Sequence, residues 1–138
     1  MTDSDLDAVA LAIARAEAST SAEIRVHLDH RCAGDPVARA VQVFERLGMH
    51  RTEDRNGVLI YAAIADRKLA VVGDTEIHAR VGEVYWRDLV DAVTRHLREG
   101  RPGEGFVHAV ADVGVMLSRH FPRRGDDRDE LENRVSIE

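Results

Sequence analysis

Two apolar runs joined by a short polar link form the clearest pattern in the chain. Residues 58–64 and 69–72 are almost entirely apolar, and residues 65–68 between them are mostly polar. Turn-forming and charged residues stand immediately before and after the pair, which is typical of a β-hairpin. Because residues 58–64 lack an alternating polar face, we expect the first hairpin strand to be covered on both sides and to lie inside a sheet.

The rest of the chain predicts one further strand and several helices. Residues 23–28 alternate apolar side chains with Arg25 and His27, so we expect a strand with one polar face, and we expect His27 to lie at the surface. Apolar residues recur every three or four positions in the segments that we expect to be amphipathic helices. These segments are 4–18, 37–47, 85–97 and 106–117, and a short helical turn is expected at 75–81.

The connections between the strands predict their directions. One predicted helix separates strand 23–28 from strand 58–64, so these two strands should be parallel with a right-handed crossover. The link at 65–68 is too short for a crossover, so strand 69–72 should run antiparallel to strand 58–64. The pattern therefore predicts an α/β fold with a small mixed sheet.

The C-terminal segment differs in composition from the rest of the chain. Residues 123–138 are rich in charge and contain few large apolar side chains. A chain of 138 residues is long enough for one core and too short for two domains of ordinary size. We therefore expect one domain over residues 1–122, followed by a charged C-terminal arm over residues 123–138.

Overall composition excludes several classes of function. The net charge is −6 and the basic residues do not cluster, which argues against a nucleic-acid partner. No apolar segment has the length of a signal peptide or a membrane span, so we expect a cytoplasmic protein without a membrane span. Cys32 is the single cysteine, which excludes an intramolecular disulfide and a thiolate metal cluster.

The predicted strand directions bring charged residues from three separate stretches to one end of the sheet. These stretches are Glu23, the loop 53–56, and residues 74–78. Carboxylates that are forced together repel one another unless a cation, an arginine or a proton neutralises them. Such an oxygen-rich group suits calcium or magnesium. The predicted metal ligands are Glu23, Asp54, Asn56, Asp74, Glu76 and His78. The alternative is that each carboxylate is simply solvated or caps a helix.

Several of the same residues resemble the motifs of the TPM domain family. The resemblance covers roughly residues 6–121 and rests on Ser21-Ala22-Glu23-Ile24, Glu53-Asp54-Arg55-Asn56-Gly57-Val58-Leu59, Asp66-Arg67-Lys68 and Gly73. It implies a three-layer α/β/α sandwich around a small mixed sheet, and divalent-cation binding at an acidic cluster. It also implies phosphomonoesterase activity for some members.

The chain departs from the commoner family pattern in two places. The aspartate-rich loop of many members keeps only Glu53 and Asp54 here, and Gly73-Asp74-Thr75 replaces a Gly-Tyr-Gly. The Ile77-His78 pair after it is similar to a short, soluble bacterial subgroup without a signal peptide or membrane helix. These differences weaken the case for catalysis more than the case for cation binding.

Three functions are consistent with these observations. The first is a regulatory or adaptor module that binds calcium or magnesium at the acidic end of the sheet. The second is a metal-assisted phosphomonoesterase in which Arg55 contacts the phosphate. The third is a protein interaction module without metal, which uses the last helices or the charged arm to bind a protein partner. We favour them in this order.

Overall fold

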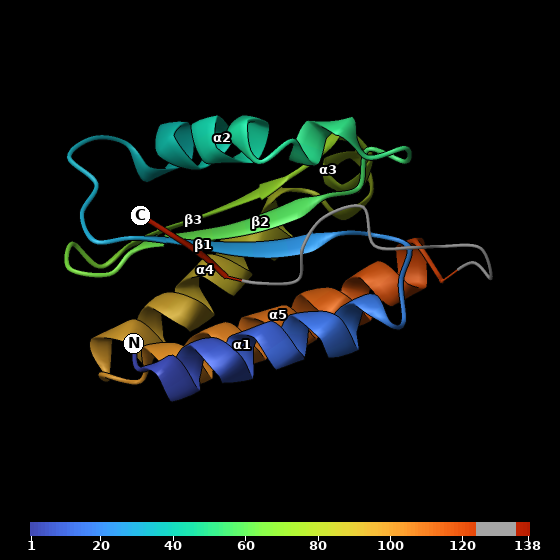
Figure 1. Ribbon diagram of the computed structural model, residues 1–138. Helices are drawn as coiled ribbons and strands as arrows, with labels where there is room; N and C mark the ends of the chain where they lie inside the picture. Colours follow the sequence, from blue (N-terminus) through green and yellow to red (C-terminus); the bar gives the residue numbers. More distant parts are fainter. Residues whose placement is uncertain (124–134) are drawn as a thin grey trace.

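A four-stranded sheet lies between two layers of helices in the computed structural model, which describes residues 1–123 and 135–138 (Figure 1). Helix α2 covers one face of the sheet, and α1, α4 and α5 form the layer on the other face. The elements are α1 (Asp3–Glu17), β1 (Ile24–Asp29), α2 (Pro36–Arg46), the 3-10 turn η1 (Met49–Arg51), β2 (Val58–Ala63), β3 (Lys68–Gly73), α3 (Thr75–Val81), α4 (Glu83–Arg98), α5 (Pro102–His120) and β4 (Ser136–Ile137). The predicted three-layer α/β/α sandwich is confirmed.

The strand directions agree with the prediction from the connections. The order in the sheet is β3-β2-β1-β4. Strand β1 pairs with β2 in parallel, with Ile24 opposite Val58, and β2 pairs with β3 antiparallel, with Val58 opposite Gly73. Every residue of β2 is buried, as expected for an apolar strand inside the sheet.

The alternation of side chains along the strands divides the core between the two helical layers. Ile24, Val26 and Leu28 of β1 belong to the same apolar cluster as the inward faces of α1, α4 and α5. Leu59 and Tyr61 of β2 belong to smaller clusters that include residues of α2. Successive side chains of a strand point to opposite faces, so this division follows from the period of two.

Arg25 and His27 share one face of β1, as predicted, but the expected surface position of His27 is wrong. The exposed fractions of Arg25 and His27 are 6% and 1%, so neither side chain lies at the surface. Both are on the side of the sheet that α2 covers, as the register with Leu59 and Tyr61 shows. This layer is a single helix that packs over polar as well as apolar positions.

The C-terminal end of the chain contributes a strand that the pattern did not predict. Of the predicted arm, residues 124–134 lie outside the described part of the chain. Ser136–Ile137 forms β4 and pairs in parallel with β1, with His27 opposite Ser136 and Leu28 opposite Ile137. Within the described ranges, no helix combines the length and the apolar character needed to span a bilayer.

Candidate functional site

Backbone hydrogen bonds join the three stretches that were predicted to converge at one end of the sheet. The Val58 amide donates to the Glu23 carbonyl at 2.8 Å, and the Asp74 amide donates to the Gly57 carbonyl at 2.9 Å. The Glu76 amide donates to the Arg55 carbonyl at 3.3 Å. We call this region, comprising Glu23, residues 53–56 and residues 74–78, the acidic edge.

Asp74 is the most firmly held carboxylate of the acidic edge. It is buried and caps the N-terminus of α3, where its Oδ1 accepts from the Thr75 amide at 2.7 Å. The Arg55 guanidinium donates to both of its oxygens at 2.9 Å, through Nε and through the second terminal nitrogen. These hydrogen bonds raise the pKa of Arg55 above its usual range. Asp74 is therefore neutralised by an arginine in this structure.

The backbone of Arg55, whose side chain contacts Asp74, has a conformation that residues other than glycine rarely adopt. Its φ angle is 51°, which lies in the left-handed region. The Arg55 side chain is 48% exposed, although Nε and one terminal nitrogen of the guanidinium donate to Asp74. Arg55 was predicted to contact a phosphate group. In this structure these two nitrogens donate to Asp74 instead.

Asp54 and Glu76 face a common cavity of about 400 Å³. Asp54 is half-buried and Glu76 is exposed. Ser21 and Arg80 also line this cavity, and Arg80 donates to the His120 carbonyl at 2.9 Å. The polar residues that line the cavity are thus Ser21, Asp54, Glu76, Arg80 and His120.

The remaining predicted ligands lie around this cavity without lining it. Asn56 is buried, and its amide nitrogen donates to Ser21 Oγ at 3.4 Å. Glu23 is also buried and precedes β1. His78 is exposed and lines a separate cavity of about 450 Å³ together with Arg55 and Asp74. The acidic edge therefore has two hollows, with Asp54 and Glu76 in one and Asp74 and His78 in the other.

The donor atoms of the acidic edge suit a hard cation better than a transition metal. Within residues 1–123 and 135–138, only His27, Asp29 and Glu138 bring three ligand atoms of His, Cys, Asp or Glu within 4.8 Å of one another. That trio lies at the opposite end of β1, so it is not part of the acidic edge. Asp54 and Glu76 offer carboxylate oxygens, with the Ser21 hydroxyl beside them. Magnesium is commonly bound by one or two carboxylates and keeps several of its waters, so this donor set fits it.

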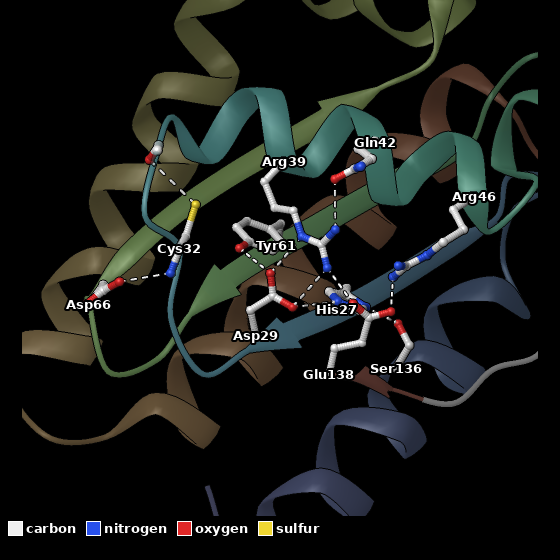
Figure 2. Close-up of polar contacts among 11 residues, drawn as sticks. His27, Asp29, Cys32, Arg39, Gln42, Arg46, Tyr61, Asp66, Ser136 and Glu138 are labelled. Atoms are coloured by element: carbon white, nitrogen blue, oxygen red, sulfur yellow. Dashed lines mark hydrogen bonds and ion pairs between the residues drawn. The ribbon is translucent and has the colours of Figure 1, made fainter.

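A second polar group, which sequence reasoning did not find, surrounds Asp29 at the C-terminal end of β1 (Figure 2). Asp29 accepts hydrogen bonds from Arg39 Nε at 2.9 Å and from the Tyr61 hydroxyl at 2.6 Å. His27 Nε2 lies 3.1 Å from its other oxygen. Arg39 also forms an ion pair with Glu138. We call the set of His27, Asp29, Arg39, Tyr61, Ser136 and Glu138 the buried polar cluster.

The protonation states of the buried polar cluster follow from these contacts. Burial alone would raise the pKa of Asp29, but hydrogen bonds from Arg39, Tyr61 and His27 outweigh it and lower the pKa to about 2. Burial lowers the pKa of His27, although the neighbouring Asp29 opposes that shift. Asp29 is therefore ionised and His27 is neutral at neutral pH.

The buried polar cluster already contains its own countercharges. Arg39 contacts both Asp29 and Glu138, and Arg46 forms a second ion pair with Glu138. A metal ion held by His27, Asp29 and Glu138 would have to displace these guanidinium groups. We therefore interpret this cluster as the anchor of β4. The sequence gives little indication of the buried polar cluster, because Glu138 is far from Asp29 along the chain.

The comparisons with known proteins agree with this fold. The sequence profile of the TPM domain matches residues 1–115. The NMR structure of the BA42 protein from the psychrophilic bacterium Bizionia argentinensis is similar over 100% of this chain and 95% of that chain, with 36% identity and a TM-score of 0.91. The N-terminal domain of the cg2496 protein from Corynebacterium glutamicum shares the fold at 17% identity and a TM-score of 0.68, over 94% of this chain and 81% of that chain. No curated protein matches this chain. On the extent of the profile match and the likeness to BA42, the chain belongs to the TPM domain family.

Proposed function

We propose that the acidic edge binds a divalent cation, calcium or magnesium, and that Asp54 and Glu76 supply its charged ligands. The observation that carries the proposal is that these two carboxylates, from segments on either side of the β2-β3 hairpin, line one cavity of about 400 Å³. Two carboxylates that line the same cavity repel each other, and a cation bound between them relieves that repulsion.

The surrounding groups define what each predicted ligand contributes. Ser21 provides a neutral oxygen within the cavity, and Asn56 positions that hydroxyl through its side-chain amide. Glu23 and Asp74 are more deeply buried, and Asp74 is paired with Arg55, so neither is a direct ligand in this proposal. His78 belongs to the neighbouring cavity and serves as an outer group.

The charge of the cavity predicts weak, solvated binding. Arg80 lines the same cavity and offsets one of the two carboxylates. A site with two protein carboxylates and several retained waters binds with a Kd on the order of 0.1–1 mM. Such an affinity suits a regulatory or adaptor domain whose loop conformation responds to the concentration of free cation.

NMR titration of chelator-stripped protein with calcium and with magnesium tests the proposal. We expect amide shifts concentrated in residues 53–57 and 74–78, which surround the two ligands. Asp54→Asn and Glu76→Gln should each weaken binding about tenfold or more, because each removes one of two charged ligands. Glu53→Gln is the matched control, since it removes the same charge from an exposed neighbour that does not line the cavity.

Two results would contradict the proposal. One is the absence of shifts at millimolar cation while the spectrum of the folded protein persists. The other is equal weakening by Glu53→Gln and Asp54→Asn, which would indicate a general charge effect instead of a site.

Arg55 distinguishes cation binding from the phosphatase alternative. Its guanidinium donates to both oxygens of Asp74, so we do not extend the proposal to phosphate hydrolysis. We expect Arg55→Gln to bind the cation at least as tightly as the parent protein, because this change makes the acidic edge more negative. A tenfold loss of cation affinity in Arg55→Gln would show that the binding site is built differently.

A further inference from the structure

Strand β4 is held on β1 mainly by hydrogen bonds and charges. The Glu138 amide donates to the Leu28 carbonyl at 2.9 Å, and Ser136 Oγ lies 2.7 Å from His27 Nδ1. Ile137 is 56% exposed, so burial of its side chain contributes little. Backbone pairing combined with polar side-chain contacts is the mode by which sheet edges recognise extended peptides.

The surface that receives β4 is organised by residues other than those of β4. Asp29 and Gln42 fix the Arg39 guanidinium, at 2.9 Å and 2.8 Å respectively. Arg39 and Arg46 lie two turns apart on α2 and both reach the Glu138 carboxylate. A pair of arginines aimed at one point is a carboxylate-binding arrangement.

We propose that the edge of β1, together with Arg39 and Arg46 of α2, is a binding site for an extended partner segment of the type Ser-X-Glu, in which X is any residue that can form a strand. In this structure residues 136–138 of the same chain occupy that site, and Figure 2 shows Ser136 and Glu138 there. A partner segment with the same chemistry competes with them for the β1 edge.

The contacts of the present occupant define the chemistry of the partner. A hydroxyl is needed opposite His27, because Ser136 Oγ contacts the ring nitrogen of this buried side chain. The next position tolerates different residues, since the Ile137 side chain is 56% exposed. The third position requires a carboxylate between Arg39 and Arg46.

A cavity lies next to the position of Glu138. Glu138 lines this cavity of about 750 Å³, whose other walls include the loop 30–35 and Gln42. Because β4 runs parallel to β1, a longer partner segment would enter this cavity after its acidic residue. Openings beyond the C-terminal ends of parallel strands are the usual ligand positions of open α/β sheets.

The experiment uses the full-length protein and the synthetic peptide Glu-Asn-Arg-Val-Ser-Ile-Glu as the probe. The occupant on the same chain has an effective concentration in the millimolar range, so the parent protein should bind the peptide weakly. The variant Ser136→Ala/Glu138→Gln weakens that occupant, and we expect it to bind the peptide about tenfold more tightly. NMR shifts of the His27 and Leu28 amides report the position of binding.

Two controls separate specific recognition from nonspecific attraction. A peptide with Gln in place of its last Glu should bind the variant about tenfold more weakly, because it lacks the carboxylate for the two arginines. Arg46→Gln in the variant background should have a similar effect. Arg87→Gln, which removes an exposed arginine on α4, should leave peptide binding unchanged.

The proposal is overturned if the folded variant shows no shifts of the β1 amides at millimolar peptide. Equal binding of the Glu and Gln peptides would also overturn it. Circular dichroism verifies that the double variant is folded. If it is not, Glu138→Gln alone provides the same comparison, because this side chain is 42% exposed and its replacement leaves the backbone pairing in place.

Discussion

Replacing Asp29 with asparagine tests whether the buried polar cluster stabilises the fold through charge. The Asp29 carboxylate is 9% exposed and is contacted by Arg39, Tyr61 and His27. Asparagine keeps the shape of the side chain and removes the charge. The Arg39 guanidinium, whose side chain is 23% exposed, would then keep only Glu138 of the two carboxylates that it contacts.

The magnitude follows from the pKa of Asp29 in the folded protein. That pKa is lowered from 3.8 to about 2. At 1.36 kcal/mol for each pKa unit, the ionised form of Asp29 stabilises the fold by about 2 kcal/mol at neutral pH. A group with a depressed pKa contributes this stability above its unfolded pKa and loses it as the pH falls through the folded value. The contribution of Asp29 is therefore complete at pH 7 and mostly lost at pH 2.

Urea unfolding followed by Trp86 fluorescence at several pH values measures this contribution. We expect Asp29→Asn to be less stable than the parent protein by about 2 kcal/mol at pH 7 and by about 1 kcal/mol at pH 3. In thermal unfolding at pH 7, the same difference corresponds to a decrease in Tm of roughly 5–10 °C. Asp91→Asn, at an exposed position of α4, is the matched control and should change stability by less than about 0.5 kcal/mol.

A constant difference between Asp29→Asn and the parent from pH 7 to pH 3 would refute the electrostatic explanation. It would show that the introduced asparagine disturbs packing or hydrogen bonding in a manner independent of ionisation. A difference that increases as the pH falls would have the wrong sign for a carboxylate with a lowered pKa.

Two further predictions concern close packing and the tyrosines. A Cβ at Gly73 would lie 2.7 Å from Trp86 Cζ2, so we expect Gly73→Ala to lower stability by about 1–3 kcal/mol and to change the Trp86 emission. Gly34→Ala is the control and should have neither effect, because no atom lies within 4 Å of its added Cβ. Unchanged stability of Gly73→Ala would contradict the packing of α4 against the end of β3. Burial raises the pKa of Tyr61 and of Tyr85, and the hydrogen bond of Tyr61 to Asp29 and the charge of Asp112 near Tyr85 raise them further. These are the two tyrosines of the chain, so absorbance at 295 nm reports both of them. At pH 10 we expect almost no tyrosinate in the folded protein and about half ionisation after unfolding. Half ionisation in the folded protein would contradict the buried environments of both side chains.

The hairpin and the direction of β1 could be predicted from the sequence because they depend on patterns that are local. An apolar run such as 58–64 excludes a solvated face, and the length of the link at 65–68 excludes a crossover. Strand β4 could not be predicted in this way. Its two residues have no periodicity, and they are extended because His27 and Leu28 pair with them.

The exposure of Arg25 and His27 shows a different limit of pattern reasoning. Alternation indicates that two sets of side chains face opposite sides of a strand, but it does not say what covers each side. Here α2 covers the polar set, and a buried ion pair from that helix, Arg39 to Asp29, compensates for part of the polar character.

For the acidic edge, strand order was sufficient to predict which segments meet. It was not sufficient to predict that Arg55 turns back onto Asp74, because that pairing depends on a left-handed residue in the loop before β2. The placement of Asp54 and Glu76 in one cavity, with His78 in the other, likewise depends on side-chain directions within a loop and a short helix.

Each end of the sheet has a buried aspartate paired with an arginine, and the two pairs differ in how readily they can open. Arg39 is 23% exposed and contacts Asp29, Gln42 and Glu138, so its withdrawal would leave a buried carboxylate without its main countercharge. Arg55 is 48% exposed, and water can solvate most of its guanidinium when it leaves Asp74. Opening of the arginine–aspartate pair therefore costs less at the acidic edge. At the other end the fixed Arg39 is better suited to hold the carboxylate of an incoming chain segment. We accordingly expect cation titration to shift residues 53–57 and 74–78 and to leave the amides of His27 and Leu28 unchanged, and peptide titration to do the reverse.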